Sequence, residues 1–304
     1  MKTTLIQALR LLLFLLPAWL PFHSTHAGTI VQFRTAIGEV EVELYDDEKP
    51  ITTTNFLRYV VDGAYTDTFL HRAARNFVFQ GGGFGVTNLG RTNEAIVSIE
   101  TRNPITNEFN VGPFRSNVRG TIAMAKGSTP NSATSQFFFN LTNNSVALDN
   151  PANSGGFTVF GRVIGSETTL DAWNGFQPLF TNNPPAGVTN LIVNLSGGSP
   201  FSPFREVPLY NLATATNGSR FASLSDLVFV DITLLRVKVT RTPDGHAEIR
   251  WNRLAGRTNT VEFTATFPPV WETLTNLPPD ALADPRVIDP TADTNRFYRV
   301  RATY

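Results

Sequence analysis

Two short segments of the sequence combine hydrogen-bond donors with large apolar residues. Residues 70–82 hold Arg72 and Gln80, and residues 135–140 hold Gln136 directly before three phenylalanines. A guanidinium is a rigid, forked donor, and an amide both donates and accepts hydrogen bonds. Such side chains on an apolar surface suit a substrate that presents an apolar ring beside an amide bond. The two segments therefore predict a site that grips an amide.

The spacing of Arg72 and Gln80 is even, which would place both on one face of a continuous strand. The pair Arg75-Asn76 between them predicts a turn, so the spacing alone does not fix their orientation. From the residues alone the favoured interpretation is structural, with the arginine paired to a nearby carboxylate and the glutamine bonded to backbone at a sheet edge. The catalytic interpretation depends on the surrounding sequence.

The composition predicts two domains and peptide partners. At 304 residues, with 41% apolar residues and 24 phenylalanines, the chain can form one larger and one smaller domain. Lysine plus arginine and aspartate plus glutamate each total 25, and like charges do not gather in long runs. This balance argues against binding to nucleic acid or to an anionic membrane.

The N-terminal residues 1–27 have the pattern of a secretory signal peptide. The basic residues Lys2 and Arg10 precede the apolar run 11–22, and small residues occupy the positions that define cleavage after Ala27. The alternative is a membrane anchor, but an anchor needs roughly 20 apolar residues, and this run is shorter and contains prolines. We expect an exported protein, periplasmic or extracellular, with no membrane segment after signal cleavage, that works as a monomer.

Cysteine is absent, which excludes disulfides, thiolate metal sites and cysteine nucleophiles. Two of the four histidines, His23 and His26, lie in the predicted signal peptide. The other two, His71 and His246, lie in different predicted domains. We therefore expect no metal site and no cofactor.

The mature chain is predicted to begin with two strands and a helix. Residues 30–33 and 40–44 are strand-like, and 40–44 alternates strictly between apolar and acidic side chains, which predicts an antiparallel pair. The threonines at 52–54 are expected to cap a helix of about three turns, and Gly63 is expected to end it.

Short β-rich runs then predict a closed antiparallel barrel, separated by stretches rich in glycine, asparagine, serine and proline. A second helix is predicted at 166–173, capped by Ser166 and ending near Gly175. Residues 176–220 read mostly as loop. Residues 227–235 have the apolar density of a central strand and are expected to close the barrel. The other predicted barrel strands include 77–80, 121–125, 136–140 and 158–163.

Beyond residue 235 the pattern changes to regular alternation, with a turn at 243–245. About 70 residues of such strands predict a small β-sandwich over 236–304, and the pattern resembles fibronectin type III-like modules. The predicted strands are 237–239, 247–251, 261–264 and 297–300.

The two donor-bearing segments resemble the signature stretches of the cyclophilins, a family of peptidyl-prolyl cis-trans isomerases. Residues 120–125 and 157–163 also match the family in residue type and order. The resemblance is strong over 29–163 and loose over 227–235. It implies a mainly β fold, with a closed antiparallel cyclophilin-like β-barrel and two helices over 28–235, followed by the small β-sandwich.

The resemblance assigns roles to individual residues. Arg72 and Gln80 match the polar members of the family's active site, which implies a catalytic role. The guanidinium is expected to donate to the prolyl amide and so to favour the twisted state of the bond. The implied partners are proline-containing peptides and unfolded exported proteins. The implied substrate-binding residues are Phe77, Val78, Ala125, Gln136, Phe138, Leu148 and Phe157.

Departures from the family pattern leave a second hypothesis open. Where the family commonly has Ile-Pro-Gly this chain has Ala74-Arg75-Asn76, and Gly83 stands where an aspartate usually follows Gln-Gly-Gly. In the second hypothesis the groove holds a proline-containing segment without turnover, and the C-terminal β domain anchors it to a partner. Retention of Arg72 favours the enzyme.

Overall fold

A computed structural model describes residues 28–164, 167–179, 189–199, 202–210, 223–235, 237–251, 258–266, 269–278, 285–291 and 296–303. The predicted signal peptide, the capping residue Ser166 and parts of the predicted loop 176–220 lie outside the described residues. Within the described part of the chain, no helix combines the length and the apolar character needed to cross a membrane.

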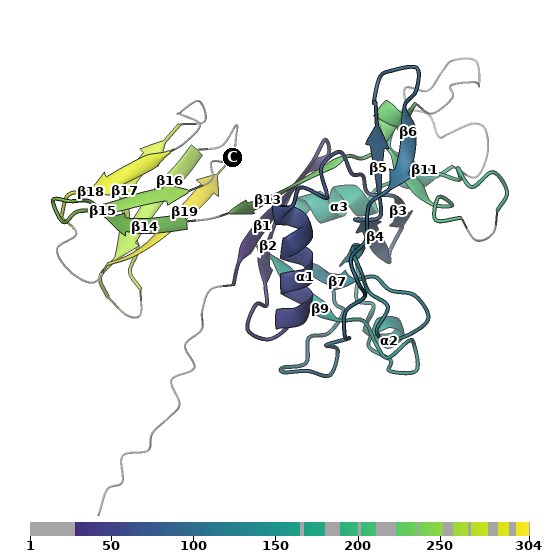
Figure 1. Cartoon of the computed structure of the whole chain (residues 1–304), viewed down its shortest axis with the longest axis horizontal. Coiled ribbons are helices and arrows are strands. Elements are labelled where there is room, and N and C mark those ends of the chain that lie inside the picture. The colour runs from purple at the N-terminus through teal and green to yellow at the C-terminus, as the bar shows by residue number, and fades with distance from the viewer. Residues whose placement is uncertain are drawn as a thin grey trace, which may run out of the picture.

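Eight strands of the described chain form one antiparallel sheet, in the order β13-β1-β2-β9-β7-β8-β4-β3. The sheet is curled and carries helices against it (Figure 1). The first hairpin and the predicted strands 77–80, 121–125, 136–140 and 158–163 all occur, within two residues of the expected bounds. The strands are β1 (Ile30–Thr35), β2 (Gly38–Leu44), β3 (Arg72–Ala74), β4 (Val78–Gly81), β7 (Thr121–Met124), β8 (Phe137–Asn140), β9 (Val159–Ile164) and β13 (Val230–Leu235).

The two ends of this sheet approach each other without pairing as strands. An isolated bridge joins Phe69 to Phe229, and the N–H of Leu70 donates to the carbonyl of Val228. The prediction of a central strand over 227–235 is wrong, because β13 begins at Val230 and is an end strand that pairs with β1. The first residues of the predicted span form isolated bridges instead of a strand. Complete closure of the barrel stays a prediction.

Aromatic side chains fill the core between the sheet and two helices. Helix α1 (Pro50–Val61) buries Phe56 and Tyr59, and α3 (Thr168–Asn174) buries Leu170 and Trp173. The indole of Trp173 stacks on Phe79, with ring centroids 5.1 Å apart. Burial of each such side chain stabilises the fold by about 1.5–3 kcal/mol, so these helices contribute strongly to the stability of the sheet that carries the site.

Helix α1 begins earlier than the sequence predicts. Pro50 occupies its first turn, where a missing N–H costs nothing, and the N-terminal donors are satisfied from far along the chain. The buried carboxylate of Glu108 accepts from the N–H of Ile51 at 3.1 Å and from the N–H of Thr52 at 2.7 Å. The expected threonine caps are therefore wrong. The second predicted helix occurs as α3, with Gly175 at its C-terminus, and the single-turn helix α2 (Ser145–Leu148) was not predicted.

The predicted loop 176–220 is wrong where it contains three short strands. They form a small sheet in the order β10-β11-β12, which we call the side sheet. It packs against the hairpin of β5 (Phe84–Thr87) and β6 (Ala95–Ser98), and the two lie close together beside β3 and β4 in Figure 1. Three-residue strands are too short to show alternation. Their bounds are β10 (Gln177–Pro178), β11 (Leu191–Val193) and β12 (Val207–Leu209), and a 3-10 turn follows at Leu224–Asp226.

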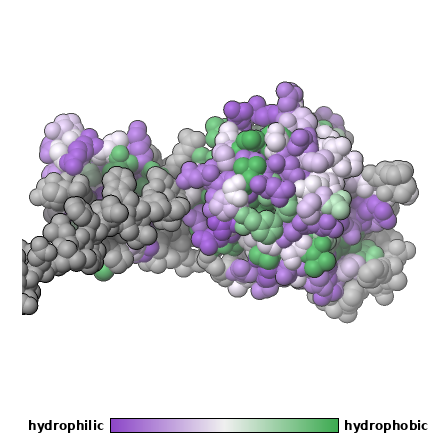
Figure 2. Space-filling model, turned by 90° about the horizontal axis from the view of Figure 1, so that it is seen from below, coloured by the Kyte–Doolittle hydropathy of each residue, from purple (hydrophilic) through white to green (hydrophobic). Residues whose placement is uncertain are grey.

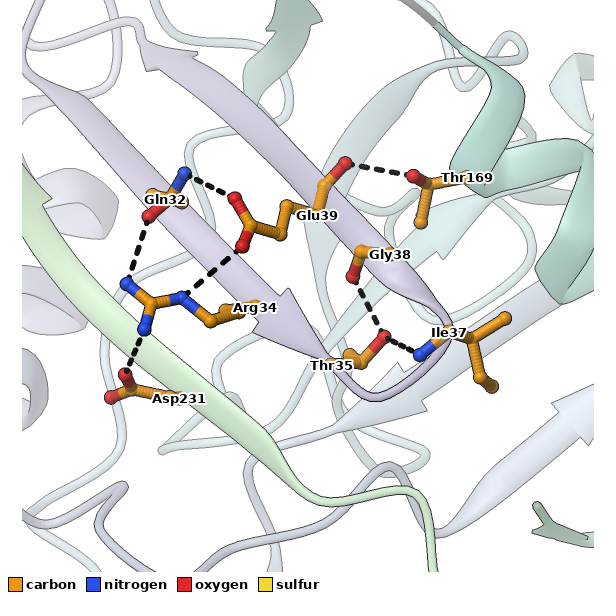
Figure 3. A network of polar contacts seen from close by, with 8 residues as sticks. All are labelled: Gln32, Arg34, Thr35, Ile37, Gly38, Glu39, Thr169 and Asp231. Atoms are coloured by element: carbon orange, nitrogen blue, oxygen red, sulfur yellow. Dashed lines mark hydrogen bonds and ion pairs between the residues drawn. The ribbon is translucent and has the colours of Figure 1, made fainter. Parts of the chain in front are cut away.

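Polar contacts connect the β1–β2 hairpin to strand β13 and to helix α3 (Figure 3). The fully buried Gln32 donates to Glu39 at 2.9 Å, and Arg34 lies between Glu39 and Asp231 of β13. From the other side, the hydroxyl of Thr169 in α3 donates to the backbone carbonyl of Glu39 at 2.8 Å. These contacts fix the hairpin against the end strand and the helix.

The C-terminal part contains two three-stranded antiparallel sheets, and the four strands predicted from the alternation lie in them. They share a cluster that includes Ile249, Trp251 and Val261. The full sandwich, its likeness to fibronectin type III modules and the domain division at residue 235 stay predictions. One sheet is β14 (Val237–Arg241), β15 (Ala247–Trp251) and β18 (Arg286–Asp289), and the other is β17 (Glu272–Leu277), β16 (Thr258–Thr264) and β19 (Phe297–Thr303). Strands β17 and β18 were not predicted.

The surface shows no single dominant apolar face in the view of Figure 2, where apolar residues of the described chain form small patches among polar ones. The exposed apolar side chains are scattered along the chain, from Ile51 to Phe297. Scattered exposure of this kind is ordinary for globular proteins.

Candidate active site

The β3–β4 hairpin places Arg72 directly opposite Gln80. Residues paired across an antiparallel ladder point to the same face of the sheet, so the turn between them brings the two side chains together. Asn76 makes this turn with φ of +55°, a left-handed conformation that asparagine tolerates better than most residues. The segment Ala74-Arg75-Asn76, which replaces the family's usual Ile-Pro-Gly, therefore still forms the hairpin.

The turn is also held from α3. The backbone N–H of Asn76 donates to Oδ1 of Asn174 at 2.7 Å, and Nδ2 of Asn174 donates back to Oδ1 of Asn76 at 3.0 Å. The next residue back, Arg75, donates to the side chain of Gln177 at 3.1 Å. The two hydrogen bonds between Asn76 and Asn174 fix the tip of the hairpin that carries Arg72, and the contact of Arg75 is an exposed one.

The same register continues across the sheet. Gln80 on β4 lies opposite Phe138 on β8, and Phe138 lies opposite Ala123 on β7. The guanidinium, the amide, the phenyl ring and the methyl group thus form one row on one face. A second amide joins the row, because Nε2 of Gln80 donates to Oε1 of Gln136 at 2.8 Å.

Gly83 makes room for the second amide. A Cβ atom added at Gly83 would lie 2.8 Å from Nε2 of Gln136, closer than unstrained contacts allow. The glycine that replaces the family's usual aspartate therefore leaves space that Gln136 fills. The loss of that carboxylate does not separate the two glutamines.

The predicted apolar residues gather in one cluster beside this row. Val78, Phe138 and Leu148 are buried, with 2%, 4% and 5% of their surface exposed, and form its base. The other predicted members, Phe77, Ala125 and Phe157, remain partly exposed. The Cζ atom of Arg72 lies 6.0 Å from the ring centroid of Phe77. All predicted apolar substrate-binding residues therefore lie in this cluster. The remaining predicted residue, Gln136, is hydrogen-bonded to Gln80 in the row beside it.

A buried polar network holds the cluster in place. Nδ2 of Asn144 donates to the backbone carbonyl of Phe77 at 2.8 Å, and Nδ2 of Asn117 donates to that of Phe157 at 2.9 Å. Asn117 also donates to Asp149 at 2.8 Å, directly after α2. Sequence reasoning missed these residues, because asparagines in irregular segments read as turn formers.

The described residues contain no group of three or more histidine, aspartate or glutamate side chains that could hold a metal ion. The arrangement offers donors, amides and apolar rings. It can bind and polarise an amide bond beside an apolar group.

Comparison with known proteins gives the family. The family model described as "Cyclophilin type peptidyl-prolyl cis-trans isomerase/CLD" matches residues 30–191. The chain belongs to the cyclophilin-type peptidyl-prolyl cis-trans isomerases.

Curated relatives of this cyclophilin carry the same activity in their names. The peptidyl-prolyl cis-trans isomerase of Acinetobacter baylyi is 41% identical over 145 residues, which are 48% of this chain and 71% of the relative. Peptidyl-prolyl cis-trans isomerase B of Escherichia coli is 37% identical over 148 residues, which are 48% of this chain and 84% of the relative.

Among solved structures, the chain is similar to a cyclophilin type peptidyl-prolyl cis-trans isomerase of Cryptosporidium parvum, crystallised in the presence of the dipeptide Ala-Pro. That protein is 24% identical, with a TM-score of 0.38, over 49% of this chain and 87% of the other.

The cyclophilin site contains a neutral imidazole beside its cation. His71 is 1% exposed, and its ring meets the edge of Phe84 with centroids 5.0 Å apart. Burial lowers the pKa of His71 to about 4, the charge of Arg72 lowers this pKa further, and a hydrogen bond with Gln136 acts in the opposite direction. At neutral pH the imidazole adds no charge beside Arg72.

One contact of this cyclophilin was not predicted from its sequence. Nε of Arg72 donates to Oε2 of Glu206 at 2.8 Å, and the two side chains are 35% and 43% exposed. Glu206 precedes β12 and lies beyond the residues that match the family. The carboxylate partner of the structural interpretation therefore exists, and it binds an arginine that also belongs to the site row.

The low pKa of His71 predicts a loss of stability in mild acid. An ordinary histidine has a pKa of 6.5, so as pH falls the unfolded chain binds a proton on His71 before the folded chain does. The contribution of neutral His71 to the free energy of unfolding is fully present above pH 6.5. It is lost as pH falls toward 4, and the loss is up to about 3 kcal/mol. Unfolding by urea at several pH values measures it, followed by tryptophan fluorescence in a chain with Trp251→Phe and Trp271→Phe so that the signal comes from Trp173.

The control variant is His246→Gln, which removes the other histidine of the described chain. It should keep the wild-type pH dependence, whereas His71→Gln should flatten it. Equal slopes for His71→Gln and wild type would contradict the assignment.

Proposed function

We propose that this isomerase works through Arg72, which donates a hydrogen bond to the prolyl amide while the proline ring contacts the apolar cluster. The observation that carries this proposal is the row made by Arg72, Gln80 and Phe138 on one face of the sheet. Proline-containing peptides are the proposed substrates.

Catalysis of Xaa-Pro bond rotation requires little beyond a well-placed hydrogen-bond donor. Rotation about an Xaa-Pro bond faces a barrier of about 18–20 kcal/mol, because amide resonance must be broken, and it takes tens to hundreds of seconds unaided. A donor that bonds more strongly to the twisted amide than to either planar form lowers this barrier. A reduction of about 4 kcal/mol gives roughly a thousandfold acceleration.

Each neighbour of Arg72 has a proposed part. The partly exposed rings of Phe77 and Phe157 contact the proline ring and exclude water from it, which strengthens the field of the guanidinium. The hydrogen-bonded amides of Gln80 and Gln136 bind the peptide backbone on either side. Neutral His71 leaves Arg72 without a competing positive charge.

The N-terminal pattern of residues 1–27 supports a role in the folding of exported proteins, in the periplasm or outside the cell. In this proposal the mature protein is a monomer without a membrane segment, and unfolded exported chains are its substrates. The N-terminal sequence of the secreted protein tests the proposal. Gly28 is expected as the first residue, and an uncleaved N-terminus would contradict export by this route.

Substitution of Arg72 tests the mechanism. Arg72→Ala should lower the isomerisation rate of a short Xaa-Pro peptide by about a hundredfold, since a lost charge-assisted donor is worth about 3 kcal/mol. Protease-coupled assays or NMR exchange measure the rate, and circular dichroism verifies the fold.

The matched control is Arg75→Ala, which removes a neighbouring exposed arginine from the same hairpin and should keep near-wild-type turnover. Near-wild-type turnover of Arg72→Ala would overturn the mechanism. Tight peptide binding by the wild type with no acceleration would favour the second hypothesis, a binding module anchored by the C-terminal β domain.

A further inference from the structure

We propose that Glu206 is a positioning residue for Arg72, and that the side sheet next to it is therefore a functional part of the active site. The inference rests on the proposed role of Arg72 as the catalytic donor. Glu206 lies outside the family match, because that match ends at residue 191.

Glu206 is attached to the site strand at two points. Its carboxylate accepts from Nε of Arg72 at 2.8 Å, and its backbone carbonyl accepts from the N–H of Ala73 at 2.7 Å. The backbone contact fixes where the side chain starts, and the side-chain contact fixes where it ends. The carboxylate is therefore held at a defined distance from the guanidinium.

The residues on both sides of Glu206 are packed. Val207 is fully buried in the cluster that the side sheet shares with Phe69. On the other side, the ring of Phe204 lies 4.7 Å from that of Phe84, which in turn meets His71. The segment that presents the carboxylate is thus held by apolar contacts that lead back to the neighbour of Arg72.

The bond through Nε suits a positioning role. An arginine side chain loses about 2 kcal/mol of rotamer freedom when it is fixed, and a bond at Nε fixes the guanidinium plane without using its two terminal nitrogens. Those terminal nitrogens of Arg72 have no hydrogen-bond partner among the described residues. They stay available to a prolyl carbonyl.

The ion pair contributes little to the stability of the fold. Both partners are more than a third exposed, and pairs of this kind are worth roughly 0–1 kcal/mol because solvent screens them. Its removal should therefore change the orientation of Arg72 far more than it changes unfolding. This difference makes function and stability separable in a test.

The chain offers a matched control pair. Nε of Arg119 donates to Oε2 of Glu167 at 2.9 Å, and the two side chains are 30% and 45% exposed. The Nε–Oε2 contact and the exposure resemble those of Arg72 and Glu206, whereas the terminal nitrogens of Arg119 also donate to Asp171 and to the carbonyl of Leu141. Neither Arg119 nor Glu167 belongs to the row or to the apolar cluster.

The test compares Glu206→Ala, Glu206→Gln and the control Glu167→Ala in the full mature chain, with kcat and KM for a short Xaa-Pro peptide measured by NMR exchange. Glu206→Ala should lower kcat by about tenfold with KM nearly unchanged, because the donor is misplaced in the transition state. Glu206→Gln keeps an acceptor for Nε and should recover most of the rate. Glu167→Ala should match wild type, and all three should melt within about 3 °C of it.

A double substitution shows whether Glu206 acts through Arg72. If it does, Glu206→Ala has no further effect on chains that already carry Arg72→Ala. An unchanged rate in Glu206→Ala, a faster rate, or a full additional loss in the double variant would each overturn the proposal. Retention of activity in Arg72→Ala alone would instead overturn the mechanism of the proposed function, so the two failures are distinct.

Discussion

The antiparallel register of β3, β4 and β8 is the constraint on which this site depends. It sets Arg72, Gln80 and Phe138 opposite one another, so that a cation, an amide and an apolar ring share one face. A slip of one residue in β3 would send the guanidinium to the other face. The hydrogen bonds between Asn76 and Asn174 at the hairpin tip oppose such a slip.

The electrostatics of the site follow from which groups are buried. His71 has almost no contact with water and stays neutral at neutral pH, so a second positive charge does not compete with Arg72 for the substrate carbonyl. Glu206 is half exposed and takes up one donor of the guanidinium. A cation that is held but not fully neutralised is what stabilisation of a twisted amide requires.

Much of the site could be predicted from the sequence, because its residues lie in local patterns. The strands that carry Gln80 and Phe138 are short, but they are rich in β-favouring side chains and lie next to turn residues. The strand that carries Arg72 has the sequence Arg-Ala-Ala, and the family motif rather than strand propensity indicated its role. The order of the family motifs then brought distant segments into one cluster. The start of α1 was mispredicted because Glu108, far along the chain, satisfies the donors that nearby threonines were expected to satisfy.

Glu206 could not be predicted for a related reason. It pairs with a residue 134 positions away, and its segment has strands of two or three residues, too short to carry a period. The asparagines behind the cluster were missed because local composition gives no sign of which carbonyl each side chain will reach. Contacts made across the fold, rather than along an element, account for each of these misses.

The most direct test of the central claim is the crystal structure of the mature protein with a bound Xaa-Pro peptide. The account predicts the proline ring in contact with the rings of Phe77 and Phe157. It also predicts a terminal nitrogen of Arg72 about 2.7–3.2 Å from the prolyl carbonyl oxygen. A peptide bound away from this cluster, or a guanidinium turned from the peptide, would contradict it.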